Sequence, residues 1–214
     1  MKETILILCA HPDDEVFGIG GTISKYVGDG KKVISVIFTY GEMAMPWMKP
    51  EEVQKIRQKE SLLAAKIIGT HETLFLGLKE GQMDKVGSES RQFLIDLIHK
   101  EQPEKIFTHS NDDPHLDHRG VYRLVCDVVK KAQYKGDLYA FDVWNPITLK
   151  KRFVPKLYVD ISQTFSQKIE ASKVFETQKM QGRWPLVPAL TMRAVVYGWL
   201  NGCKYAERFR KIDV

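Results

Sequence analysis

Short, continuously apolar runs alternate along the chain with longer segments in which apolar residues recur every three or four positions. The run 5–9 is apolar throughout and far too short to span a membrane, which is typical of a strand buried on both faces. Apolar side chains then recur at helical spacing over 16–27. The whole pattern predicts strands at 4–10, 33–38, 74–76, 106–108, 137–143 and 157–160, and helices at about 15–28, 51–68, 88–100, 117–132, 163–178 and 192–200.

This alternation predicts an α/β fold with a mostly parallel sheet and helices on both faces, because a helical connection between two paired strands makes them parallel. A Pro-rich segment at 185–188 is expected to interrupt the chain before the last helix, and the residues after that helix are expected to form a terminal segment. With 214 residues and 43% hydrophobic content, the chain is expected to fold as a single domain over 1–214.

Charge and cysteine content bear on partners and location. The formal net charge is +5, but Lys and Arg are interleaved with acids, so nucleic acid is not expected as a partner and an acidic substrate is weakly favoured. Three scattered cysteines with apolar neighbours indicate reduced thiols in a cytoplasmic protein. No apolar run approaches the ~18 residues of a spanning helix, so no membrane span is expected.

Polar residues begin abruptly where the first apolar run ends, with the cluster His11-Pro12-Asp13-Asp14-Glu15. A second cluster, 109–119, follows the predicted strand 106–108 and contains three histidines and three aspartates. In open α/β sheets, ligands bind just beyond the carboxyl ends of the strands. Both clusters are therefore expected at the same edge of the sheet.

Metal binding would explain both clusters at once. A catalytic zinc takes three protein ligands from histidine nitrogen and carboxylate oxygen and leaves a fourth position open. His11 and Asp14, three residues apart across a strand-to-helix turn, can converge on one ion, and a histidine of the second cluster can complete the set. Asp13 stands beside them as a carboxylate that can take a proton from water. Fe(II) accepts the same ligands as Zn(II).

Simpler structural explanations exist for these residues. Asp14 and Glu15 suit the first turn of a helix, and Asp112-Asp113-Pro114 suits a turn. The glycines of Gly18-Ile-Gly20-Gly21 suggest dinucleotide binding, but the third glycine of that motif would fall at Ile23. We therefore interpret these glycines as allowing a helix to approach the sheet closely.

Together the two clusters resemble the signatures of the PIG-L/LmbE-like zinc-dependent N-deacetylases. The matching stretches are Ala10-His-Pro-Asp-Asp-Glu15, Gly20-Gly21-Thr22 and His115-x-Asp117-His118-Arg119. The resemblance implies a Rossmann-like α/β fold and a hydrolase that removes an N-acetyl group from an N-acetylglucosamine-type substrate. It implies one zinc ion per chain, bound by His11, Asp14 and His118. It also makes Asp13 the general base and Asp117 the residue that orients His115.

The functional assignments of Arg57 and Asp117 have structural alternatives. Arg57 is a candidate substrate-binding residue, because its guanidinium suits a carboxylate or phosphate, but Arg57 and Glu60 are also spaced for an exposed ion pair. Protonated His115 is expected to stabilise the oxyanion, with the Asp117 charge raising the pKa of His115 above its reference of ~6.5. The alternative is that Asp117 merely caps the helix that begins there.

The expected partner is a small amino-sugar conjugate, acidic conjugates included, and a homo-oligomer is compatible with the sequence. Leu116 stands where the family often has Pro, a difference that bears on the rigidity of the loop and not on the chemistry. Tyr40 stands where the family often has Asp, which leaves the identity of the substrate open. A zinc amidase acting on another amide or thiol conjugate is one alternative. A non-catalytic, zinc-bearing sugar-binding protein is another. The loop at 43–50 could be a lid over the site.

Overall fold

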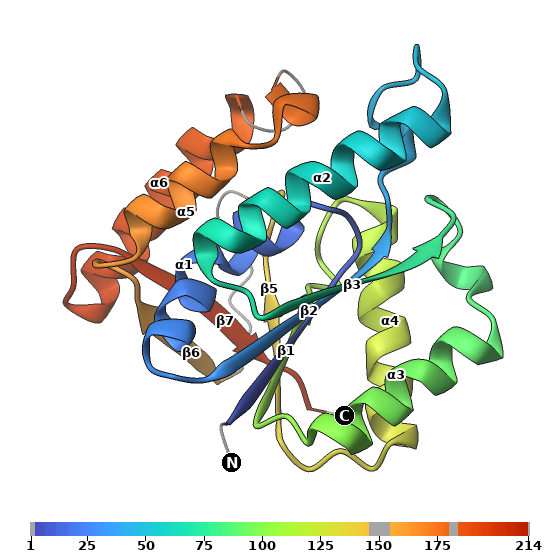
Figure 1. Cartoon of the computed structure of the whole chain (residues 1–214). Coiled ribbons are helices and arrows are strands. Elements are labelled where there is room, and N and C mark those ends of the chain that lie inside the picture. The colour runs from blue at the N-terminus through green and yellow to red at the C-terminus, as the bar shows by residue number, and fades with distance from the viewer. Residues whose placement is uncertain (1–2, 146–154, 180–183, 214) are drawn as a thin grey trace.

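The computed structural model describes residues 3–145, 155–179 and 184–213, and Figure 1 shows helices packed on both faces of one twisted sheet. The strands are β1 Thr4–Cys9, β2 Lys32–Thr39, β3 Glu72–Leu78, β4 Lys105–His109, β5 Asp137–Phe141, β6 Lys156–Asp160 and β7 Ala206–Lys211. The helices are α1 Asp14–Gly28, α2 Pro50–Ile68, α3 Ser88–Glu101, α4 Leu116–Lys131, α5 Phe165–Lys173 and α6 Trp184–Asn201. Short 3₁₀ turns are η1 Glu42–Ala44, η2 Met83–Lys85 and η3 Glu176–Gln178.

The sheet has the strand order β3-β2-β1-β4-β5-β7-β6. The strands from β3 to β5 pair in parallel, whereas β7 is antiparallel to both β5 and β6. The predicted α/β class and the mostly parallel sheet are confirmed. The order 3-2-1-4-5 is that of doubly wound folds, and it reverses direction between β1 and β4.

Strand β1 lies inside the sheet, between β2 and β4, and all six of its residues are buried. Ile5, Ile7 and Cys9 contribute to the apolar core that also contains residues of α1, α2, α5 and α6. Leu6 and Leu8 contribute to the core on the other face, with α3 and α4. A strand covered on both faces needs apolar side chains in both directions, which explains the uninterrupted apolar run.

The glycines of α1 allow the close approach to the sheet that the sequence predicted. A Cβ atom at Gly18 would collide with the ring of Phe141 on β5, and one at Gly21 would lie 2.7 Å from Ile161. Helix α1 therefore packs against its neighbours at a distance that larger residues would prevent.

The C-terminal third differs from the prediction in three places. The helix expected at 163–178 ends at Lys173. The Pro-rich segment 185–188 lies within α6 instead of breaking the chain. Pro185 is the second residue of α6, where an N–H has no helical partner, so this proline costs little. Pro188 lies inside the helix and gives up one backbone hydrogen bond. The terminal segment contains β7, whose buried Glu207 and Arg210 hide the apolar alternation typical of a strand. Among the described residues, no helix is long and apolar enough to cross a membrane.

Candidate metal centre and active site

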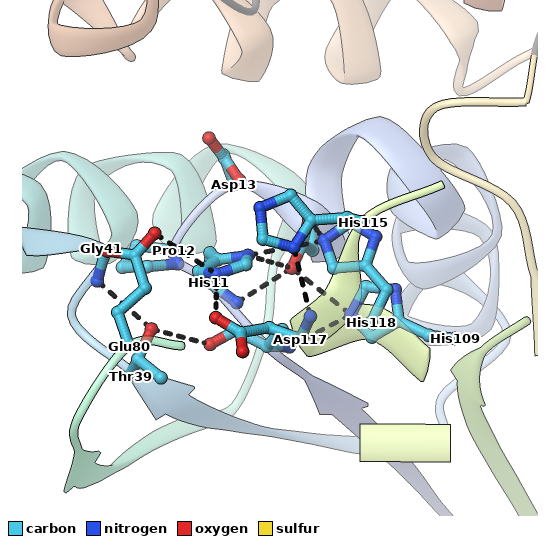
Figure 2. A network of polar contacts seen from close by, with 12 residues as sticks. His11, Pro12, Asp13, Thr39, Gly41, Glu80, His109, His115, Asp117 and His118 are labelled. Atoms are coloured by element: carbon cyan, nitrogen blue, oxygen red, sulfur yellow. Dashed lines mark hydrogen bonds and ion pairs between the residues drawn. The ribbon is translucent and has the colours of Figure 1, made fainter. Parts of the chain in front are cut away.

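The first cluster lies in the turn between β1 and α1, and the second lies between β4 and α4, on the two strands where the strand order reverses. Neighbouring groups fix the first turn. The N–H of Ala10 donates to Nε2 of His109 (2.9 Å), and the hydroxyl of Thr39 donates to the carbonyl of Ala10 (3.0 Å). The N–H of His11 donates to Oδ2 of Asp14 (2.7 Å). Figure 2 shows the two clusters brought together at this edge of the sheet.

The side chains of His11, Asp14 and His118 converge and could together bind a metal ion. Nδ1 of His11 lies 3.3 Å from Oδ2 of Asp14, and Nε2 of His118 lies 3.2 Å from Oδ1 of Asp14. The two imidazole nitrogens, Nδ1 of His11 and Nε2 of His118, are 3.3 Å apart. Ligand atoms bound to tetrahedral zinc at 2.0–2.2 Å are separated by about 3.3 Å, so this spacing fits one such ion. All three residues are buried.

His109 lies close to the same group but has a different function in the structure. Its ring stacks on that of His118, with centroids 3.9 Å apart, and its Nε2 is 3.2 Å from Oδ2 of Asp14. That nitrogen already accepts the N–H of Ala10, so its lone pair is engaged. Burial, together with the nearby His118, lowers the pKa of His109 to about 4. His109 is therefore a neutral support of the turn, and the free nitrogens belong to His11 and His118.

Asp113 supports His118, a contact that the sequence analysis missed. Its Oδ1 lies 3.0 Å from Nδ1 of His118 and accepts the N–H of His115 at 2.9 Å. The carboxylate is completely buried, and although burial opposes the charge, the contact with His118 keeps the pKa of Asp113 below its usual value. A carboxylate on the far nitrogen of a metal-binding histidine orients the ring and makes it a better ligand. The sequence had assigned Asp113 only to a turn.

Asp117 contacts His11 rather than the ring of His115. Its Oδ2 lies 3.3 Å from Nε2 of His11 and accepts the N–H of Gly81 at 2.9 Å. Asp117 does not cap α4, because the N-cap residue is His115, whose Nδ1 accepts the N–H of Asp117 (3.2 Å). His11 therefore presents Nδ1 to Asp14 and His118, while Nε2 faces a carboxylate. The capping alternative for Asp117 is wrong.

His115 packs against two of the possible metal ligands. Its ring centroid lies 4.7 Å from that of His11 and 4.7 Å from that of His118. Burial and the charges of these two histidines lower the pKa of His115, and the opposing effect of Asp117 is smaller. The direction is opposite to the one expected from the sequence. Since Nδ1 accepts a backbone N–H, the neutral ring carries its proton on Nε2 and can donate it.

Asp13 stands apart from the group of ligands, and Figure 2 shows its carboxylate turned away from the histidines. It is the N-cap residue of α1 but makes no side-chain cap, and Asp14 makes none either, since its carboxylate accepts the N–H of His11. The backbone of Asp13 has φ 132°, a conformation that L-residues rarely adopt. Its N–H donates to Oε2 of Glu15 (3.1 Å). Burial raises the pKa of Asp13 to about 6, against the lowering effect of Arg57.

Arg57 is buried, with 2% of its surface exposed, so the alternative of an exposed ion pair with Glu60 is wrong. Its guanidinium donates to the carbonyl of Pro12 (2.8 Å), the carbonyl of Tyr40 (3.1 Å) and Oδ2 of Asp13 (3.2 Å). The side chain thus holds the turn that carries Asp13. A contact between Arg57 and substrate remains a prediction.

A cavity of about 280 Å³ opens over these groups. Asp13, His115 and Arg57 all line it, together with His11, Asp14, Gly41, Met43, Ala44, Glu80, Trp144 and Gln178. The N–H of Trp144 donates to Asp113 (3.3 Å), and the carbonyls on either side of Trp144 accept from Arg193 of α6. A proton acceptor, a proton donor and two of the three possible metal ligands, His11 and Asp14, therefore line one cavity.

The family profile described as "PIG-L: GlcNAc-PI de-N-acetylase" matches residues 6–129, a stretch that includes both clusters and more than half of the chain. The chain belongs to the PIG-L family. The resemblance seen in the two sequence clusters is thereby confirmed.

Relatives within and around the PIG-L family have several activities. Diacetylchitobiose deacetylase of Thermococcus kodakarensis is 28% identical over 96% of this chain and 82% of its own length. The 4-oxalmesaconate hydratase of Pseudomonas putida is 27% identical over 83% of this chain and 75% of its own. Among solved structures, N,N'-diacetylchitobiose deacetylase of Pyrococcus horikoshii superposes with a TM-score of 0.81 at 27% identity, over 98% of this chain and 84% of that one.

Proposed function

We propose that this PIG-L protein is a metal-dependent hydrolase that removes the acetyl group from an N-acetylglucosamine-type sugar, giving acetate and a free amine. The observation that carries the proposal is the grouping of His11, Asp14 and His118 at 3.2–3.3 Å from one another. His11 and Asp14 line a cavity that Asp13 also lines. The diacetylchitobiose deacetylases among its relatives support the choice of an acetamido sugar.

Nδ1 of His11, the carboxylate of Asp14 and Nε2 of His118 would hold the metal. We assign zinc, because a mixed set of nitrogen and carboxylate ligands with buried supporting carboxylates suits it, and Fe(II) is the alternative. When bound, the ion supplies Lewis-acid polarisation of the amide carbonyl and of water.

Asp13 takes a proton from the attacking water at its carboxylate, and Arg57 holds that carboxylate in place. His115 donates its Nε2–H to the carbonyl oxygen as that oxygen becomes negative. Asp13 then returns the proton to the departing nitrogen, so the amide C–N bond breaks to give a neutral amine. In this scheme His115 acts as a neutral donor, and its lowered pKa is consistent with that role.

The acids of the cavity favour an uncharged sugar over an anionic substrate. Asp13 and Glu80 both line the chamber, whereas the guanidinium of Arg57 is engaged by protein oxygens. An acidic conjugate would therefore place its charge outside this chamber. The alternative amidase activities use the same catalytic groups and differ only in the group that the cavity accepts.

The decisive experiment measures acetate and primary amine released from N-acetylglucosamine, N,N'-diacetylchitobiose and a set of neutral and acidic N-acetylglucosamine conjugates. We expect equal amounts of the two products, released about 10²–10⁴-fold more slowly by Asp13→Asn. Elemental analysis of the same protein is expected to find one divalent metal ion per chain, which His118→Ala should lose. A metal-loaded wild-type protein that releases neither product from any of these sugars would contradict the proposal.

A further inference from the structure

Helix α6 is apolar on its outer face as well as on its buried face. Leu190, Ala194 and Tyr197 are buried toward the molecule. The outward side chains Met192, Val195, Val196, Trp199 and Leu200 have exposed fractions of 46%, 48%, 37%, 79% and 55%. Surface helices normally carry charged residues on the outer face, and a helix that is apolar all round belongs in a buried environment. Within the described part of the chain, only one side of α6 is covered.

The contrast with α2 shows that this outer face is unusual for the protein. On α2 the exposed Leu62 and Leu63 lie among the exposed Lys59 and Lys66. On α6 the one charged residue, Arg193, is buried and donates to the carbonyls of Val143 and Asn145. No charge therefore interrupts the outer face of α6.

The spacing of these outward residues is the same in both directions along the helix. Pro188, Met192, Val195 and Trp199 are separated by four, three and four positions. When such a row meets a second copy of itself in antiparallel orientation, Trp199 faces Pro188 and Met192 faces Val195, twice over. We propose that α6 pairs with α6 of a second copy of this chain across a two-fold axis, centred between Arg193 and Ala194.

A cavity beside Pro188, at the N-terminal end of this row of residues, suits the antiparallel arrangement. It has a volume of about 540 Å³ and is lined by residues of α5 and η3, by Val187 and Pro188 of α6, and by Lys179. Pro188 and Trp199 are eleven residues apart, which is about 16 Å along a helix. In the antiparallel pair each Trp199 therefore reaches the cavity of the other copy, and the two cavities receive two equivalent indole rings.

The exposed area is of the size that a specific dimer needs. The five outward side chains expose on the order of 500 Å² of largely apolar surface per copy, given the 150–250 Å² that a large aromatic residue can bury. Two copies together then bury about 1,000 Å², near the lower limit for a specific interface. Helices that lie on membranes are instead rich in Lys and Arg on the polar face, which α6 lacks. These features favour a second copy over a lipid surface.

The test is the mass of the full chain in solution, measured by light scattering and sedimentation over a range of concentrations. We expect a dimer, or an assembly built from such dimers, and the dimeric unit should be lost in Trp199→Glu. The matched control is Phe93→Glu on α3, which also adds an acid at an exposed apolar residue (42%) and should leave the mass unchanged. Circular dichroism and amine release verify that each variant is folded.

A charge exchange tests the register of the two helices. Met192→Lys and Val195→Glu should each weaken the dimer, and the double variant should restore it, because lysine and glutamate then face each other twice. A monomeric wild-type chain would overturn the proposal, as would a dimer unaffected by Trp199→Glu. A monomer that binds anionic lipid vesicles would assign the face to membranes instead. If the double variant stays monomeric, the antiparallel register is wrong.

Discussion

Asp13 combines a strained backbone with a carboxylate whose pKa lies close to neutrality. A φ of 132° costs about 1–3 kcal/mol, and the hydrogen bonds that Glu15 and Arg57 make to this turn hold it in place. Burial raises the pKa of Asp13 to about 6, despite the opposing charge of Arg57. A carboxylate with that pKa is mostly ionised at pH 7 and still basic enough to accept a proton from water.

Asp13→Asn is therefore expected to keep the metal and to lower the turnover rate by about 10²–10⁴-fold. The wild-type rate should fall as the pH decreases through about 6, because Asp13 works as the ionised base and is protonated below that pH. Turnover against pH and metal content by elemental analysis measure the two effects. If the variant loses its metal, Asp13 is a ligand and the functions of Asp13 and Asp14 must be exchanged.

Asp113 affects metal binding through His118. Asp113→Asn keeps the shape of the side chain but removes the charge 3.0 Å from Nδ1 of His118, so we expect a 10–100-fold loss of metal affinity. Competition with a chelator measures it. Asp112→Asn is the matched control, because Asp112 is the adjacent acid and its carboxylate contacts Arg210 (3.5 Å). Equal effects of the two variants would show that Asp113 is not specific to the metal centre.

At the scale of elements, the approach of α1 to the sheet depends on glycine. Gly21→Ala would place a methyl group 2.7 Å from Ile161, so we expect a loss of about 1–3 kcal/mol in the free energy of unfolding. Gly28→Ala is the control on the same helix, because a Cβ there has no atom within 4 Å and should stabilise by up to about 1 kcal/mol. Urea denaturation of both variants measures the difference. Equal changes in the free energy of unfolding would mean that helix propensity alone determines the stability of both variants.

The elements that the sequence predicts correctly are those whose buried positions follow a regular apolar pattern. The run that became β1 is apolar because both of its faces are covered, and the position of the two clusters followed from parallel strands. Strand β7 was missed because it buries Glu207 and Arg210 with partners that are distant in the chain. Asp113 and Asp117 could not be assigned correctly either, since their functions depend on which histidine nitrogen each carboxylate reaches.

At the scale of the whole molecule, one buried ion pair joins the C-terminal part of the sheet to two helices. Glu207 of β7 accepts from Lys168 of α5 at 2.5 Å and from the N–H groups of Gly21 (3.2 Å) and Thr22 (2.8 Å) in α1. Both charged side chains are almost completely buried. Burial lowers the pKa of Lys168, and the charge of Glu207 opposes this change.

Lys168→Met should therefore destabilise the protein by about 3–5 kcal/mol, because it leaves the charge of Glu207 buried without a cation. The double variant Lys168→Met, Glu207→Gln should lose less than the sum of the two single variants. Denaturant unfolding of the four proteins gives the interaction energy between the two residues. Additivity within about 0.5 kcal/mol would contradict a direct coupling between them.

His11 and His118 both contact the carboxylate of Asp14, and this arrangement affects how the site binds a metal ion. Burial disfavours the charged form of both rings, but their carboxylate neighbours outweigh it and raise the pKa of His11 to about 10 and that of His118 to about 9. Without metal, both imidazoles are thus cationic at pH 7, and both must be neutral to act as ligands. Calorimetric titration in buffers of different ionisation enthalpy should find about two protons released per ion bound, and fewer than one would contradict this.

Two protons leaving and one divalent cation arriving exchange equal charge. Asp14 therefore faces two positive charges before the exchange and two afterwards. Binding of the ion is then an exchange for two protons at the same three side chains, and we expect mild acid to reverse it.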